Sequence, residues 1–255
     1  MRVATWNVNS VKARRERLLR WLERHTPDVL CLQELKGTDD KFPMDDVRGL
    51  GYAAAVFGQK TYNGVAIIAR QEPQDVHRGF ADGVDDPQAR FISAKVGGQR
   101  IICAYVPNGR EVGSEAYAYK LQWFERLREY LAQHHNPGEE LILCGDFNCA
   151  PRDCDVARPD EWRDTVLTHS DVRAALRDLV AWGLVDTFSK LHEEGGVYSW
   201  WDYRQLGFPK GNGLRIDQLY ATEPLARRCS EAWIDREERK GKLPSDHAPV
   251  VAEFA

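Results

Sequence analysis

The sequence predicts an α/β fold: one domain, residues 1–255, in which mixed β-sheets are covered by helices. Three observations support this prediction. The 255 residues suffice for one large domain with a sizeable core. Groups of short, apolar, strand-like segments alternate with segments whose apolar residues recur at helical spacing. No low-complexity linker and no internal repeat divides the sequence into separate units.

The composition is typical of a globular protein, with 43% hydrophobic and 29% charged residues. No apolar run approaches the ~20 residues of a membrane-spanning helix, and the start of the chain has no apolar signal core. We therefore expect a cytoplasmic, monomeric protein without membrane contact. The net charge of −4 argues against a generic nucleic-acid coat, but it allows a local basic rim around an acidic metal site.

The six cysteines form no C-x-x-C pair. Cys31, Cys103 and Cys144 lie in apolar strand-like runs, which predicts buried free thiols. Cys144, Cys149 and Cys154 are spaced by five residues, which fits no usual zinc knuckle, so a zinc site is disfavoured.

The first predicted elements are a strand over residues 2–6 and a helix that Ser10 caps. The apolar stripe of this helix comprises Val11, Leu18, Leu19 and Leu22. Its other face carries the basic residues Lys12, Arg14, Arg15, Arg17, Arg20 and Arg24. This face is either a solvated helix surface or a rim that tracks phosphates, with Lys12 to Arg15 as the contacts.

The next strand, residues 29–32, is apolar on both faces and should be central in its sheet. A turn at residues 62–64 is predicted to join two following strands as a hairpin, and residues 151–169 read as a long polar loop. Further strands are predicted over residues 52–57, 65–69, 91–96, 101–106, 141–144, 197–203, 215–221, 229–234 and 248–254. Two further helices are predicted over residues 114–133 and 171–182.

The most informative strand end follows residues 141–144, where Gly145 precedes Asp146 and Asn148. Side chains alternate along a strand, so the carboxylate and the amide project to one face. This pair suits a general base with a polar group that orients it. It is equally typical of an Asp-x-Asn turn that only caps backbone groups.

Other strand ends also carry polar side chains, namely Asn7, Asn9, Glu34, Tyr105, Asn108, Asp217, Asp246 and His247. Carboxylates and amides without clustered cysteines suit a hard cation, Mg²⁺ or Mn²⁺, rather than zinc. His247 suits a charged contact to an anionic oxygen, although taken alone it is equally a satisfied structural histidine.

Seven motifs occur in an order that resembles the exonuclease III family of apurinic/apyrimidinic (AP) endonucleases. They lie at residues 6–10, 32–36, 105–109, 145–148, 198–204, 213–217 and 245–249, so the likeness covers nearly the whole chain. Glu34, Asp146-x-Asn148 and Asp246-His247 are shared with the wider endonuclease/exonuclease/phosphatase superfamily. Residues 200–204 and 215–217 point to the DNA-repair branch. The resemblance implies a four-layer α/β sandwich, two mixed β-sheets packed face to face with helices on the outside.

The resemblance also implies roles for the site residues. Glu34 would bind the metal, with Asn9 and Asp246 at or near it, and Asn7 would help to hold that shell and the phosphate. Asp146 would activate or position the attacking water, and Asn148 would orient Asp146 and the substrate. His247 would contact the scissile phosphate, Asp217 would fix the imidazole, and Tyr105 would stabilise the transition state or the leaving oxygen.

The implied activity is that of a Mg²⁺-dependent nuclease, with Mn²⁺ as a substitute, that cuts double-stranded DNA 5' to abasic sites and leaves a 3'-hydroxyl. Exonuclease action from 3' ends and trimming of blocked 3' ends are also implied. The substrate contacts would come from Asn108, Trp200, Leu214, Ile216, Lys36, Lys12 and Arg15.

Some relatives have tryptophan at the position of Leu214, and leucine offers less ring surface to the abasic sugar. Trp200 and Trp201 are also readable as half-buried core aromatics. Two other functions stay open: a phosphatase or phosphodiesterase of lipid or inositol phosphates, and a non-catalytic DNA-binding scaffold that uses the basic helix face.

Overall fold

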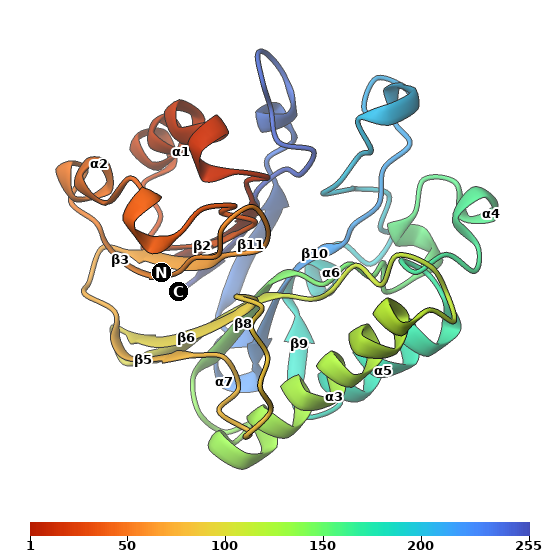
Figure 1. Cartoon of the computed structure of the whole chain (residues 1–255), viewed down its shortest axis with the longest axis horizontal. Helices are drawn as coiled ribbons and strands as arrows, with labels where there is room; N and C mark the ends of the chain where they lie inside the picture. Colours follow the sequence, from red (N-terminus) through yellow and green to blue (C-terminus); the bar gives the residue numbers. More distant parts are fainter.

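Two six-stranded mixed β-sheets pack face to face, and helices cover both outer faces (Figure 1). The computed structural model describes residues 1–255 apart from the side chain of Gln205. This arrangement confirms the predicted four-layer α/β sandwich.

The first sheet has the strand order β11-β12-β1-β2-β4-β3, in which only β1 and β2 run parallel. Its strands are β1 (Arg2–Asn7), β2 (Val29–Gln33), β3 (Ala53–Phe57), β4 (Val65–Ala69), β11 (Cys229–Ile234) and β12 (Val250–Phe254).

The second sheet has the order β5-β6-β7-β8-β10-β9, in which only β7 and β8 run parallel. Its strands are β5 (Gln74–Arg78), β6 (Phe91–Val96), β7 (Gln99–Tyr105), β8 (Leu141–Asp146), β9 (Leu184–Asp186) and β10 (Asp217–Thr222).

The α-helices are α1 (Val11–His25), α2 (Met44–Gly49), α3 (Glu115–His134), α4 (Pro159–Trp162), α5 (Ser170–Val180), α6 (Thr187–Leu191) and α7 (Glu223–Ala226). Helices α1 and α2 lie outside the first sheet, and α3 and α5 outside the second (Figure 1). Ser10 caps α1 as predicted, because its hydroxyl accepts a hydrogen bond from the Ala13 amide at 3.3 Å.

Each parallel pair is joined by one crossover helix, α1 for β1 and β2 and α3 for β7 and β8. Parallel strands joined in this way end at the same edge of their sheet. The register places Asn7 beside Gln33 at the end of one pair, and Tyr105 beside Asp146 at the end of the other. The polar residues that follow these strands therefore gather at one edge of the sandwich.

The central strands are buried on both faces, which explains their continuous apolar runs. In β2, for example, Cys31 faces the core between the two sheets, whereas Leu30 and Leu32 face the core beneath α1 and α2. Cys103 and Cys144 point into the same inter-sheet core as Cys31. Among the described residues all six cysteines are unpaired, and Cys31, Cys103 and Cys144 are buried as predicted.

Several local predictions were wrong. Residues 197–203 form no strand; only Trp200 pairs there, through single bridges to Leu214 and His247, because this segment crosses the ends of both sheets. The predicted hairpin is present, since β3 and β4 pair antiparallel, but residues 58–64 connect the strands instead of a tight turn at residues 62–64 alone. Strand β5 was missed because its side chains are mostly polar and exposed, as is typical of an edge strand.

The predicted long loop at residues 151–169 also contains short helical turns, Asp153–Asp155 and α4. Two other short 3₁₀ turns, Arg204–Leu206 and Arg236–Arg239, lie in the loops that follow it toward the C-terminus. A further one is Asp39–Lys41. Within the described part of the chain, no helix has both the length and the apolar character needed to cross a membrane.

Candidate active site

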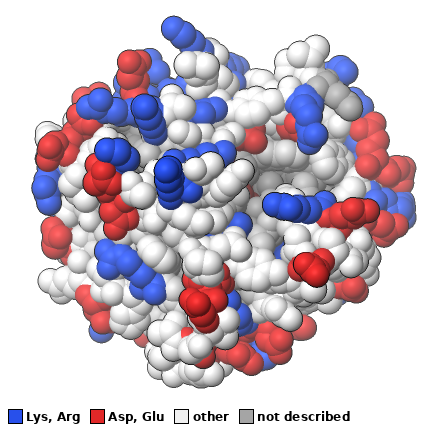
Figure 2. All heavy atoms as spheres, in the orientation of Figure 1, with Lys and Arg blue, Asp and Glu red and all other residues white. Residues whose placement is uncertain are grey.

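A cleft of about 650 Å³ lies at the edge where the two parallel strand pairs end. The predicted residues that line it are Glu34, Tyr105, Asn108, Asp146, Asn148, Trp200, Ile216, Asp246 and His247. The face drawn in Figure 2 is hollowed near its centre, and lysine and arginine side chains stand around the hollow. The structure thus brings residues from six of the seven motifs of the sequence to one opening.

Glu34 follows β2 in a left-handed backbone conformation, with φ of 56°. Its Oε1 accepts hydrogen bonds from Asn7 Nδ2 at 2.8 Å and from the Tyr105 hydroxyl at 2.9 Å. Its Oε2 pairs with Lys36 Nζ at 2.8 Å. Burial would raise the pKa of Glu34, but the charge of Lys36 and the hydrogen bond from Asn7 lower it below its ordinary value. Glu34 is therefore ionised near neutral pH.

Asp146 ends β8 and is 1% exposed. Its Oδ2 accepts from Asn7 Nδ2 at 2.9 Å, so one amide group bridges Asp146 and Glu34. Its Oδ1 accepts from the Asn148 backbone N–H at 2.9 Å. Burial raises the pKa of Asp146 to about 7, because the charged form loses hydration. The Asp-x-Asn turn is thus present, and it holds a carboxyl group whose pKa lies near neutrality.

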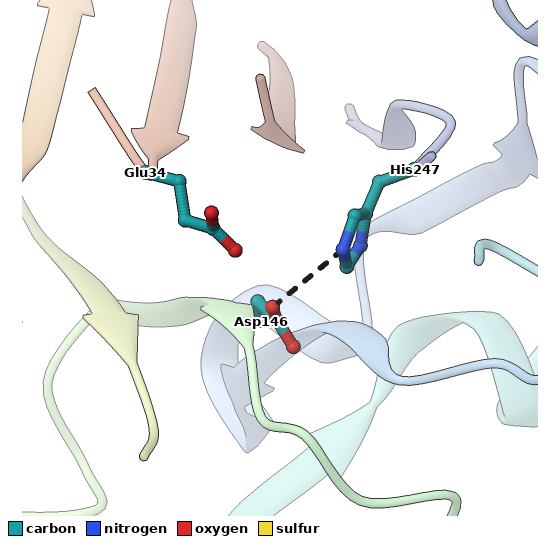
Figure 3. Close-up of side chains that lie close together, drawn as sticks. All are labelled: Glu34, Asp146 and His247. Atoms are coloured by element: carbon teal, nitrogen blue, oxygen red, sulfur yellow. Dashed lines mark ion pairs between the residues drawn. The ribbon is translucent and has the colours of Figure 1, made fainter. Parts of the chain in front are cut away.

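His247 stands between the carboxyl groups of Asp217 and Asp146, and Figure 3 shows its ion pair with Asp146. Its Nδ1 lies 2.9 Å from Asp217 Oδ2, and its Nε2 lies 3.8 Å from Asp146 Oδ2. Burial would lower the pKa of His247, but the charges of Asp217 and then Asp146 outweigh this and raise it to about 10. The imidazole is therefore a cation at neutral pH, and its Nε2–H faces the cleft side of Asp146.

Asp246 directly precedes His247 in the chain and lines the same cleft. Its Oδ1 accepts from Asn9 Nδ2 at 2.8 Å, and its Oδ2 accepts from the Trp200 indole N–H at 3.0 Å. Burial would raise the pKa of Asp246, but the His247 charge and these two hydrogen bonds lower it. Asp246 is therefore ionised, like Glu34.

Tyr105 completes the polar lining. Its hydroxyl donates to Glu34, and the Arg90 guanidinium lies 4.5 Å from the centre of its ring. Burial, followed by the negative charge of Glu34, raises the pKa of Tyr105 well above its ordinary value. The phenol therefore remains protonated and serves as a hydrogen-bond donor.

Three side chains present one ligand atom each within 4.8 Å of one another: Glu34, Asp146 and His247. Figure 3 shows all three pointing into the same space. A protonated imidazole has no free lone pair, so the carboxylates are the members of this group that suit a cation. The set predicted from the sequence was Glu34, Asn9 and Asp246; of these, Asn9 and Asp246 form an adjacent hydrogen-bonded pair.

The predicted substrate contacts are only partly brought together. Trp200, Ile216 and Asn108 line the cleft, but Leu214 is fully buried and pairs with Trp200 through a single bridge. Lys36 is occupied with Glu34 and Asn9. The other two predicted contacts, Lys12 and Arg15, do not line the cleft.

The basic residues of α1 differ in their surroundings. Lys12 is exposed, and Arg15 forms a two-pronged pair with Asp46 at 2.6 and 2.7 Å. By contrast, Arg14 donates to the carbonyls of Asn9 and Pro244, so it ties the helix to the site. Periodicity could not separate these cases, because the difference depends on loops that are distant in the sequence.

Several cleft residues were missed from the sequence. Trp162 packs edge-on against Trp200, with ring centres 5.6 Å apart, and Arg110 and Arg204 stand at the same opening. A tryptophan within the polar residues 151–169 was the available signal for Trp162. Lys120 was missed too: it occupies a core position of α3, and a lysine at such a position was itself a signal.

Comparison with known proteins places this geometry among related molecules. Residues 4–247 match the Endonuclease/Exonuclease/phosphatase family. Exodeoxyribonuclease III of Haemophilus influenzae is 35% identical over 100% of both chains. The structure of an AP endonuclease from Archaeoglobus fulgidus matches with a TM-score of 0.97 and 40% identity, covering 100% of this chain and 99% of that one. The 3' phosphatase NExo from Neisseria, bound to a product DNA hairpin, matches with a TM-score of 0.96 and 41% identity, at the same coverage.

Proposed function

The chain belongs to the Endonuclease/Exonuclease/phosphatase family and is a DNA-repair nuclease. We propose that it hydrolyses the DNA backbone 5' to abasic sites and leaves a 3'-hydroxyl. The observation that carries this proposal is the arrangement of Asp146 and His247. A buried carboxyl group with a pKa near 7 lies 3.8 Å from an imidazolium that a second carboxylate holds in place. This combination suits in-line attack by water on an anionic phosphodiester.

In this proposal, Asp146 accepts the proton of the attacking water. Asn148 and Asn7 hold the carboxyl group through hydrogen bonds at 2.9 Å to its two oxygen atoms. The new bond joins the water oxygen to phosphorus, and the bond from phosphorus to the 3' oxygen breaks. Ionised Asp146 is required at the start, so a pKa near 7 keeps it both available and basic.

His247 donates from Nε2 to a non-bridging oxygen of the phosphate, and Asp217 holds its ring in orientation through Nδ1. Charge builds on these oxygens in the transition state, so a fixed cation stabilises the transition state more than the substrate. Tyr105 stays protonated and donates a hydrogen bond that stabilises the transition state or the leaving 3' oxygen, which takes up its proton from solvent.

The carboxylates of Glu34 and Asp246 fit a divalent metal, because both stay ionised and offer oxygen ligands, with the amide of Asn9 beside Asp246. We propose Mg²⁺, with Mn²⁺ as a substitute, held by Glu34 with Asn9 and Asp246 at or near it. When bound, the metal would neutralise charge on the phosphoryl oxygens. Asn7 supports this shell, since its amide already joins Glu34 to Asp146.

The proposed substrate is double-stranded DNA with abasic sites or 3' ends. The description of the Neisseria relative as a 3' phosphatase with a DNA hairpin supports trimming of 3' ends as a second action of the same site. Trp200 and Ile216 offer an apolar wall for a sugar without a base. Leu214 supports this wall, because its backbone pairs with that of Trp200. We further propose that the chain works as one catalytic domain and as a monomer.

The test is a gel assay on a duplex with one abasic-site analogue, run with and without Mg²⁺ beside an undamaged duplex. We expect incision 5' to the lesion and a 3'-hydroxyl terminus, only with the metal. A third arm offers a 3'-phosphorylated end. Release of phosphate without incision would restrict the function to 3' ends. Hydrolysis of inositol phosphates with no action on DNA would contradict the proposal.

A further inference from the structure

Lys120 is a lysine that lies entirely inside the protein. It is 0% exposed and sits on the buried face of α3, between Tyr117 and Phe124. Removing an ammonium group from water is costly unless hydrogen bonds replace its hydration. Apolar residues at this position would complete the helix face, so the presence of lysine calls for a physical reason.

Each of the three ammonium hydrogens has a backbone carbonyl as its acceptor. Lys120 Nζ donates to the carbonyl of Val166 at 2.6 Å, of Asn148 at 2.7 Å and of Asn108 at 3.0 Å. An ammonium has three donors, so its capacity is filled. Asn108, Asn148 and Val166 all line the cleft. They belong to the segments that follow β7, β8 and α4, and a single side chain therefore joins three walls of the cleft.

The carbonyl of Asn148 is the contact that matters most for the site. Asn148 has a left-handed backbone, with φ of 47°. Its N–H donates to Asp146 Oδ1, and its side chain accepts from Asn108 Nδ2 at 3.1 Å and donates to the carbonyl of Val106 at 3.0 Å. Lys120 thus holds Asn148 through its carbonyl, and Asn148 in turn holds Asp146 through its backbone N–H.

We propose that Lys120 is a positioning residue for the hydrolysis: its ammonium fixes the Asp146–Asn148 turn relative to Asn108 and the Val166 segment, and so sets the direction in which the Asp146 carboxylate faces the substrate. This inference rests on the proposed function. Lys120 does not touch the substrate; it acts through the backbone.

Two further features agree with this role. Burial lowers the pKa of Lys120 to about 8, so the ammonium remains mostly charged at neutral pH, and its charge lies near Asp146. Gly109 leaves the room that the lysine needs, because a Cβ atom there would lie 3.0 Å from Lys120 Cδ. The absence of a side chain at Gly109 therefore leaves space for the Lys120 side chain.

The alternative is that Lys120 is only a buried stabilising cation. Arg215 is an example of that kind: it is 0% exposed and its guanidinium pairs with the carboxylates of Asp155 and Asp186, both at 2.8 Å. Lys120 differs because its partners are uncharged carbonyls of residues that line the cleft. A stabilising cation would affect unfolding, whereas a positioning residue affects turnover in the folded enzyme.

The experiment compares Lys120→Met with Lys95→Met, which makes the same change at an exposed lysine of β6 remote from the cleft. Single-turnover cleavage and equilibrium binding are measured on the abasic duplex. We expect Lys120→Met to cleave about 10- to 100-fold more slowly, because small misplacement of a catalytic group has effects of this size. Its DNA affinity should stay within about threefold of the wild type, because the lysine makes no contact with DNA. Lys95→Met should match the wild type.

A second readout does not depend on cleavage. In ¹H–¹⁵N spectra of the free protein, the backbone amide of Asn148 and the side-chain amides of Asn108 and Asn148 should shift in Lys120→Met, and the Asn148 amide should exchange faster with solvent. If the wild type fails to cut abasic DNA, the proposed function fails, yet these amide signals still test the anchoring by Lys120.

Three results would overturn the inference. One is a folded Lys120→Met that cleaves within about threefold of the wild-type rate, because misplacement should cost more than this. Another is an equal loss of rate and DNA affinity, with spectral changes spread through both sheets. If Lys120→Met does not fold, Lys120→Gln, which keeps donors at this position, takes its place; failure of both to fold would make Lys120 a general stabilising residue.

Discussion

The two sheets supply carboxyl groups of opposite character to the same cleft. Glu34 and Asp246, which precede or follow strands of the first sheet, both have lowered pKa values. Asp146, which ends a strand of the second sheet, has a pKa raised to about 7. All three are largely buried, so burial alone does not explain the difference. Positive charge and donated hydrogen bonds outweigh burial at Glu34 and Asp246, whereas at Asp146 they do not.

The two kinds of carboxyl group therefore suit different roles in the reaction. A carboxylate that stays ionised at every working pH can bind a cation, but it is a poor proton acceptor. A group with a pKa near neutrality suits proton transfer. Asn7 connects the two kinds, because its amide donates to both Glu34 and Asp146.

Removal of the metal should have the largest effect. The carboxylates of Glu34 and Asp246 are held ionised, and without a cation their charge repels the phosphate. We expect exhaustive EDTA treatment to abolish cleavage and added Mg²⁺ to restore it, as measured on the abasic duplex. Mn²⁺ should also restore cleavage. Cleavage that persists after exhaustive chelation would remove the metal from the proposal.

Asp146→Asn tests the carboxyl group whose pKa is raised. The amide cannot accept the proton of water, so we expect kcat to fall by about 10³-fold, which is within the usual range for loss of a general base. Binding of abasic duplex should be retained. Asp178→Asn, at an exposed site of α5, is the matched control and should behave as the wild type. Near-normal turnover of purified Asp146→Asn would show that another group prepares the water.

Much of this contrast could be predicted from the sequence, but not its electrostatics. The resemblance of the ordered motifs to the exonuclease III family implied that Glu34, Asp146 and His247 would share one opening. What no local pattern contained was the hydrogen bond from Trp200 to Asp246, or the burial of Leu214. Both depend on the segment at residues 197–203, which was predicted as a strand and instead crosses the ends of both sheets.

Edge elements were also hard to predict, for a physical reason. Strand β5 is exposed and polar, so it lacks the apolar alternation that marks a half-buried strand. The basic residues of α1 were ambiguous because their partners lie far away in sequence: Arg17, for example, donates to the carbonyl of Lys242. Helical periodicity describes which face a residue occupies, not which loop packs on that face.

Asp217→Asn should have an intermediate effect and sharpen the role of His247. The Asp217 charge raises the pKa of His247, so its removal should lower that pKa toward the ordinary value. In the wild type, kcat/KM should rise as Asp146 ionises near pH 7 and fall as His247 loses its proton near pH 10. In the variant, the alkaline fall should move down by about one pH unit or more. An unmoved alkaline limb would assign it to another group.

Trp200→Phe should have the smallest effect, and it tests whether the substrate wall and the charged shell are coupled. Phenylalanine keeps an apolar ring against the sugar but removes the indole N–H that donates to Asp246 Oδ2 at 3.0 Å. A hydrogen bond to a charged group contributes about 1.5 kcal/mol, so we expect the metal to bind several-fold more weakly. Titration of the free enzyme with Mn²⁺, followed by electron paramagnetic resonance, measures this without any turnover. DNA affinity in the absence of metal should change less, because the ring remains.

If metal affinity is unchanged while DNA affinity falls, Trp200 serves only as a wall of the cleft, and Asp246 is held ionised by Asn9 and His247 alone.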